Sequence, residues 1–181
     1  MIKTKLRPVV PYTGMPVLAT AFLLLSAGVL DPFIVLRFEL LIVFGYIAAA
    51  IDLRTRRIPN SLVLLMLASW ILVMIPRLFY DTDMAVALFV DSAVGFAIGG
   101  VIFLLVYFIS RKGLGGGDVK FMAVVGLYLG SAGILPAMLC GTVLAALTAL
   151  MLILLKRISK KDAIPLSPFL YAGILVTVFL L

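Results

Sequence analysis

The chain has 181 residues, of which 65% are hydrophobic and only 13% are charged. These proportions lie far outside the range of soluble globular proteins and indicate one domain embedded in a membrane. The net charge of +7 does not indicate nucleic-acid binding, because the basic residues are spread over short segments that flank apolar runs.

Apolar runs follow one another along the chain, and most approach the roughly 20 residues that a membrane-crossing helix needs. They lack the alternation of polar and apolar residues found in outer-membrane strands, so helices are expected. The sequence predicts an all-α polytopic bundle of about seven transmembrane spans, at residues 15–30, 33–51, 61–80, 85–109, 119–135, 136–155 and 164–181.

The basic residues predict how these spans are oriented. All Lys and Arg residues except Arg37 and Arg77 flank the predicted spans on one side of the membrane. Positively charged loops remain in the cytoplasm, so this side is expected to be cytosolic. The N-terminus is then inside and the C-terminus outside.

Small residues recur at four-residue spacing within several spans, a pattern that allows close packing of helices in lipid. The pairs are Gly45 and Ala49, Gly95 and Gly99, Gly126 and Gly130, and Gly141 and Ala145. They predict helix contacts and carry no functional message.

Charged residues also occur deeper in the predicted membrane, where each needs a partner or a role because charge is costly in lipid. Arg37 and Glu39 lie in the second span and Asp91 lies in the fourth. The expected pairs are Arg37 with Asp91, or Glu39 with Arg77. A proton or ion pathway through the two acids is the alternative.

Two aspartates mark the predicted cytosolic face: Asp52 ends the second span and Asp118 begins the fifth. Separately, Asp52 can pair with Arg56 and Asp118 can cap its helix. Held together, two carboxyl groups do not both ionise easily, so one keeps a proton while the other acts as a base. Such a pair can activate water and protonate a departing amine.

The stretch KGLGGGDVKF places three glycines directly before Asp118, namely Gly115, Gly116 and Gly117. They offer unshielded backbone that can adopt positive φ, pair with an extended peptide, or let Asp118 move toward Asp52. Lys120 does not follow a glycine as in a phosphate-binding loop, so that interpretation is rejected. In the segment IPLSPFLYAG, Ser167 before Pro168 has the form of a helix cap.

No histidine occurs, and Cys140 is the single cysteine. A disulfide framework and a cysteine-based zinc site are therefore excluded, and no metal or other cofactor is expected.

Three segments, in order, carry a family resemblance: DLRTRRIPN from Asp52, GGGDVK from Gly115 to Lys120, and IPLSPFLYAG at residues 164–173. They resemble the type IV prepilin peptidases, which are intramembrane aspartyl proteases with a G-x-G-D motif. The resemblance covers spans two to seven. Residues 32–181 would form a six-helix peptidase core, preceded by a tail and an extra helix at residues 1–31.

The resemblance implies an aspartic endopeptidase in the bacterial inner membrane that removes the short basic leader of prepilins or pseudopilins at the cytosolic face. Asp52 and Asp118 match the family's catalytic residues. The loop expected to meet the substrate contains Gly115, Gly116, Gly117 and Lys120. The chain is similar to the short peptidases of tight-adherence pilus systems, which lack the domain with paired C-x-x-C motifs, so methyl transfer is not expected.

The expected partners are the prepilin substrate and membrane lipid, with no nucleic acid. A different class of function is the alternative, namely a proton- or cation-coupled transporter. Its relay groups would be Glu39, Asp52, Asp91 and Asp118.

Overall fold

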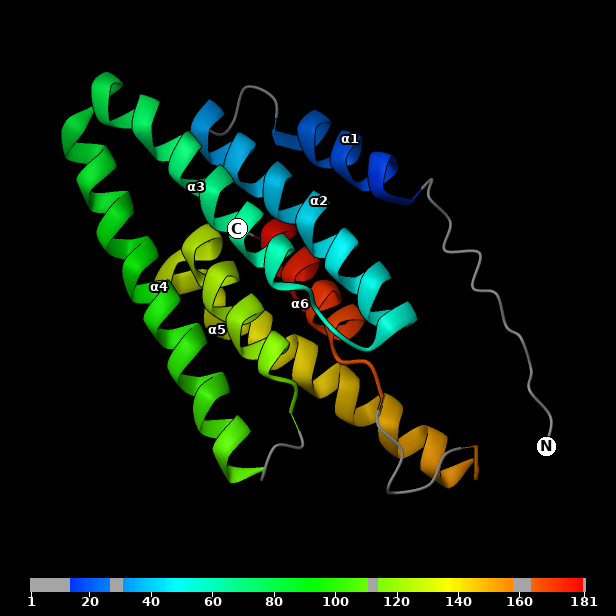
Figure 1. The fold of residues 1–181 in the computed structure, drawn as a ribbon. Coiled ribbons are helices and arrows are strands. Elements are labelled where there is room, and N and C mark those ends of the chain that lie inside the picture. The colour runs from blue at the N-terminus through cyan, green and yellow to red at the C-terminus, as the bar shows by residue number, and fades with distance from the viewer. Residues whose placement is uncertain (1–13, 27–30, 111–113, 158–163, 181) are drawn as a thin grey trace.

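The structure, a computed structural model, describes residues 14–26, 31–110, 114–157 and 164–180. Within these ranges the chain is helical and contains no strand, which confirms the all-α prediction. The helices pack into one bundle (Figure 1) and are α1 (Gly14–Ser26), α2 (Pro32–Thr55), α3 (Asn60–Tyr80), α4 (Thr82–Ile109), α5 (Gly116–Leu154) and α6 (Ser167–Leu180).

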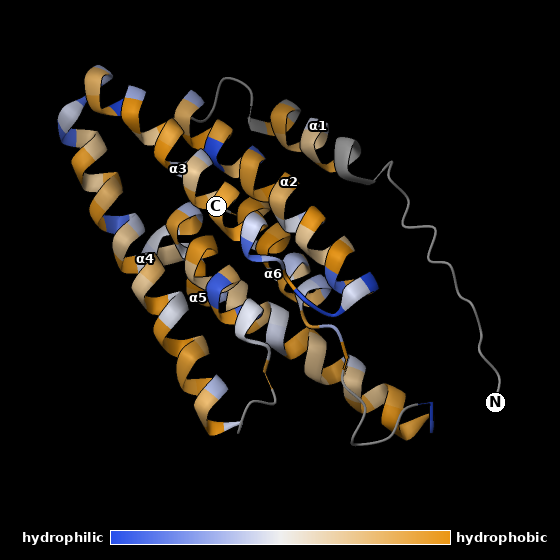
Figure 2. Cartoon of the chain, in the orientation of Figure 1, coloured by the Kyte–Doolittle hydropathy of each residue, from blue (hydrophilic) through white to orange (hydrophobic). Residues whose placement is uncertain are grey.

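Four of the described helices, α2 to α5, are long and apolar enough to cross a membrane. Figure 2 shows the same pattern, with hydrophobic colour along most of the helices and hydrophilic colour concentrated at some of their ends. The chain is therefore a multi-pass membrane protein. The predicted first span is described only over the 13 residues of α1. Many basic residues used to predict orientation, at 1–13, 111–113 and 158–163, lie outside the described residues.

Helix α5 is a hairpin of two arms that reverses at Gly130, which has φ 71° and ψ −175°. A Cβ atom added to Gly99 of α4 would lie 2.5 Å from the Met122 carbonyl oxygen and 3.3 Å from Ile134 Cδ1. In a straight helix, positions 122 and 134 would be roughly 18 Å apart. Figure 1 shows the two arms running in opposite directions.

The fifth and sixth predicted spans correspond to these two arms, but the predicted boundary at residues 135 and 136 is wrong. Pro136 lies inside the second arm. The reversal occurs at Gly130 because glycine adopts positive φ without the steric cost that a Cβ atom imposes.

Glycines allow the closest contacts between helices, as their spacing predicts. A Cβ atom at Gly95 of α4 would overlap the backbone of Gly126 in α5. Likewise, a Cβ atom at Gly173 of α6 would overlap the backbone of the second arm at Ala137 and Gly141. These contacts hold α4 and α6 against the two arms of α5.

The end of α2 and the starts of α3, α5 and α6 gather at one end of the bundle (Figure 1). Segments that are far apart in sequence, including both aspartates of interest, therefore meet there.

Candidate active site

Asp52 and Asp118 line one cleft, of about 390 Å³, at this end of the bundle. Asp52 is buried, with 5% of its surface exposed, whereas Asp118 is partly exposed. The cleft is also lined by Arg56, Arg57, Ile58, Asn60 and the glycines at 115–117. The structure thus brings together the two aspartates that the sequence singles out.

Asp52 is held by the start of α6. Ser167 is the first residue of that helix, and its backbone N–H donates to Asp52 Oδ2 at 3.1 Å. The first N–H groups of a helix have no acceptor within the helix, and the next residue, Pro168, has no N–H to offer. The positive end of the α6 dipole therefore faces the buried carboxyl group.

Asp118 lies in the first turn of α5 and contacts the same serine. The Ser167 hydroxyl donates to Asp118 Oδ1 at 3.3 Å. A serine before a proline predicts a cap for its own helix. Instead its hydroxyl reaches another helix, and one residue contacts both aspartates.

The three glycines have different surroundings. A Cβ atom on Gly115 would lie 2.7 Å from Asp118 Oδ2, and one on Gly117 would lie 3.2 Å from Ile58 Cβ. Gly116 has no atom within 4 Å of the added Cβ and is exposed. None of these three glycines has positive φ in this structure; among the described glycines, only Gly130 does. Helix α5 begins at Gly116. The absence of a side chain at these positions leaves room for the Asp118 carboxyl group, for Ile58 and, at Gly116, for an approaching molecule.

Basic residues lie at the rim of the cleft. Lys120 Nζ donates to Asn60 Oδ1 at 3.1 Å, which joins the starts of α5 and α3. Arg56 ends α2 in a left-handed conformation, φ 54°, and its N–H donates to the Asp52 carbonyl oxygen. The Asp52–Arg56 ion pair considered from sequence is not found between these two described residues; the Asp52 carboxyl group accepts from Ser167.

A second carboxylate site lies at the far end of the first arm of α5. Asp91 Oδ1 accepts hydrogen bonds from the backbone N–H of Ser131, at 3.0 Å, and from its hydroxyl. A Cβ atom at Gly130 would overlap the Asp91 carboxylate. Arg37 is buried with Asp91 near enough for their charges to interact, but no hydrogen bond or ion pair between them is found among the described residues.

The predicted pair of Glu39 with Arg77 is wrong. Arg77 Nη1 instead contacts Asp31 Oδ2 at 2.6 Å. Asp31 also caps α2 by accepting from the Phe33 N–H at 2.9 Å. The Arg77 guanidinium lies over the Phe33 ring, 4.9 Å from its centroid, so the N-terminal end of α2 supplies both of its contacts.

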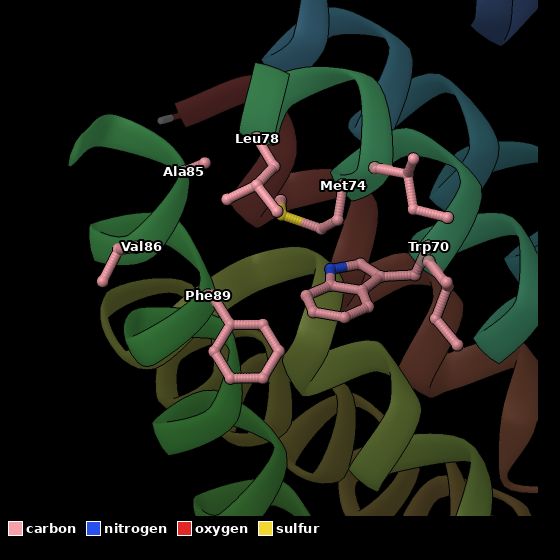
Figure 3. Close-up of a pocket in the computed structure, with 8 residues that line it drawn as sticks. Trp70, Met74, Leu78, Ala85, Val86 and Phe89 are labelled. Atoms are coloured by element: carbon pink, nitrogen blue, oxygen red, sulfur yellow. The ribbon is translucent and has the colours of Figure 1, made fainter. Parts of the chain in front are cut away.

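Another hollow, of about 330 Å³, lies between α3 and α4 (Figure 3). Trp70 and Met74 from α3 and Phe89 from α4 are among the apolar side chains that line it. It contains no titratable group, so it offers no chemistry. Within the described part of the chain, no three His, Cys, Asp or Glu side chains gather as a possible metal site.

Residues 39–154, which include both cleft aspartates, match the type IV leader peptidase family. A prepilin leader peptidase/N-methyltransferase of Bacillus subtilis (strain 168) is 30% identical over 161 residues, covering 86% of this chain. The chain spans 61% of that relative's length. No solved structure gave a significant match.

Proposed function

The chain belongs to the type IV leader peptidase family, and we propose that it is an aspartic endopeptidase with Asp52 and Asp118 as its catalytic pair. The observation that carries this proposal is the contact of both carboxyl groups with Ser167 beside one cleft. Two carboxyl groups so arranged can share one proton, which hydrolysis by this mechanism requires.

In the proposed reaction, the ionised carboxylate takes a proton from water as the water oxygen attacks the scissile carbonyl carbon. The protonated carboxyl group donates its proton to the carbonyl oxygen. Collapse of the tetrahedral intermediate then breaks the C–N bond. The departing nitrogen receives the proton that came from water, and the carboxylate that protonated the carbonyl oxygen takes back a hydroxyl proton from the intermediate. One carboxyl group acts first as a base and then as an acid, and the other acts in the opposite order, so neither can be replaced by an amide.

The substrate's extended backbone would enter along Gly115 and Gly116, which are exposed at the cleft. Gly116 has open space around it, so a peptide can approach closely there. Gly117 packs against Ile58 and ties the α5 start to the segment after α2. Gly117 is thus held against Ile58 on one side of the cleft, whereas Gly116 leaves the cleft open to a peptide.

The proposed substrates are prepilin or pseudopilin precursors, with a short basic leader followed by an apolar helix. Arg56 and Arg57 line the cleft and would repel leader cations there. We therefore place uncharged residues at the scissile bond and the leader's basic residues at the headgroups of anionic lipids, which attract them. We propose that the cleft lies at the cytosolic face of the bacterial inner membrane, where such lipids would hold the leader.

The test is to incubate the purified protein, in lipid, with a membrane-anchored prepilin from the same genome and to detect the leader by mass spectrometry. The wild-type protein is expected to release one leader fragment from the prepilin. The Asp52→Asn and Asp118→Asn variants are expected to release none. Absence of release from wild-type protein that is shown to be folded would contradict the proposal and favour the transporter alternative.

A further inference from the structure

We propose that Ser167 is the positioning residue of the aspartate pair, holding Asp52 through its backbone N–H and Asp118 through its hydroxyl. Ser167 can have this role in catalysis only if the proposed function holds, since it acts through the two aspartates. The sequence pattern around Ser167 predicts only a helix cap.

The two contacts come from one small, fully buried residue. The Ser167 N–H lies 3.1 Å from Asp52 Oδ2, and Ser167 Oγ lies 3.3 Å from Asp118 Oδ1. None of the Ser167 surface is exposed. Hydrogen bonds to carboxyl groups are strengthened where water is kept away, so this residue constrains the spacing of the pair.

The two hydrogen bonds differ in what they permit. A backbone N–H can only donate, so Asp52 Oδ2 must act as an acceptor. A serine hydroxyl can donate or accept, so its contact with Asp118 can persist whether or not that carboxyl group carries a proton. Ser167 therefore holds Asp52 in place as an acceptor. It can keep its hydrogen bond to Asp118 in either protonation state of that carboxyl group.

The packing of α6 makes this position rigid. A Cβ atom at Gly173 would overlap the backbone of the second arm of α5, and one at Gly45 would lie 2.7 Å from the Tyr171 ring. Helix α6 is thus closely packed against both α5 and α2. Catalytic groups need supports held in this way, because small displacements from the productive geometry reduce the rate.

Another hydroxyl on the same helix provides the matched control. Thr177 is also buried, and its Oγ1 donates to the Gly173 carbonyl of its own helix at 3.0 Å. Thr177→Val removes a buried hydroxyl from α6 without touching the aspartates. Ser167→Ala removes the contact with Asp118 and keeps the N–H that holds Asp52.

The first experiment measures prepilin cleavage by wild-type protein, Ser167→Ala, Ser167→Thr and Thr177→Val, each checked for thermal stability. Ser167→Ala should lower kcat roughly 10- to 100-fold, as expected for loss of a hydrogen bond to a charged group, with little change in KM. The limbs of its pH–rate profile should also move. Ser167→Thr should recover much of the lost kcat, and Thr177→Val should match the wild-type protein.

A wild-type kcat and pH profile in Ser167→Ala would overturn the proposal. So would a loss of kcat that is accompanied by lower thermal stability and an unchanged pH profile, since that indicates a purely structural role. Neither outcome affects the assignment of the protein as a peptidase, because the wild-type protein would still cleave.

An infrared pH titration of the carboxyl groups gives a readout that does not depend on cleavage. Bands of the pair are assigned from their loss in Asp52→Asn and Asp118→Asn. The midpoint of the pair should differ between wild-type protein and Ser167→Ala. Identical titrations would overturn the role of Ser167 even if the wild-type protein cleaved no prepilin, a result that would separately contradict the proposed function.

Discussion

Asp52 and Asp91 each accept a hydrogen bond from the N–H of a serine that begins a helical arm, yet their surroundings differ. At Asp91, the N–H and the hydroxyl of Ser131 both bond to the same carboxylate oxygen, and buried Arg37 supplies a nearby charge. At Asp52, the hydroxyl of Ser167 turns instead to a second carboxyl group beside a cleft.

The comparison shows that a serine at a helix start can serve two purposes. Where both of its donors bond to one acid and a cation lies nearby, the acid stabilises a chain reversal. Where its donors are divided between two acids at an open cleft, we propose that the acids take part in catalysis. The first arm of α5 runs between the two sites, from Asp118 near its start to Gly130 at its end.

The largest expected effect comes from the cleft aspartates. Asp52→Asn and Asp118→Asn should each lower kcat/KM on the order of 10⁴-fold or more, and the double variant should be no worse, because the two carboxyl groups act as a unit. Thermal unfolding should change little. Additive losses in the double variant would show that the two groups do not act together.

Asp91 should show the opposite pattern, with stability lost and the chemistry of folded molecules retained. Asp91→Ala leaves the Ser131 N–H without its acceptor and Arg37 without its nearby charge, and should lower the free energy of unfolding by about 3 kcal/mol. Denaturation in mild detergent measures this loss. If the folded Asp91→Ala variant no longer cleaves prepilin, the assignment of a structural role to Asp91 and a catalytic role to the cleft aspartates is wrong.

The two serines allow the comparison to be sharpened with a smaller change. Ser131→Ala keeps the N–H bond to Asp91 and removes the hydroxyl bond, so we expect a stability loss of about 1 kcal/mol and an unchanged kcat. Ser167→Ala should affect kcat instead. Similar stability losses with no kcat change in either variant would make the two serines equivalent.

Asp31 is a third carboxylate for comparison, away from the cleft. It caps α2 and pairs with Arg77. Although partial burial acts in the opposite direction, hydrogen bonds from Arg77 and the Phe33 N–H hold the pKa of Asp31 below its ordinary value. Its contribution is therefore present above the unfolded-state pKa and is lost as pH falls through the folded-state pKa.

Asp31→Asn should accordingly reduce stability near neutral pH by about 1 kcal/mol or less, the scale of an N-cap or an exposed ion pair. The difference from wild-type protein should disappear in acid. A difference that grows as pH falls would contradict this sign.

Hydropathy and the DLRTRRIPN and GGGD segments were sufficient to predict a helical membrane bundle and to select Asp52 and Asp118 as a candidate pair. The hairpin boundary was not predicted because Pro136 is the stronger local signal for a helix break, whereas Gly130, where the chain reverses, lies against Asp91 of another helix. Local sequence does not encode that contact.

The direction of the Ser167 hydroxyl was also missed, for a related reason. A serine before a proline usually indicates a helix cap, and only the packing of α6 against α5 brings it within reach of Asp118. Similarly, charge and depth suggested Glu39 for Arg77, but Arg77 pairs with Asp31, the N-cap of α2.

The most direct test of the aspartate pair is prepilin cleavage in ¹⁸O-labelled water, followed by mass spectrometry of the released leader. Attack by water at the scissile carbonyl predicts one ¹⁸O atom in the new leader carboxylate for wild-type protein, and no leader from Asp52→Asn or Asp118→Asn. Efficient release of leader by either asparagine variant would contradict the account.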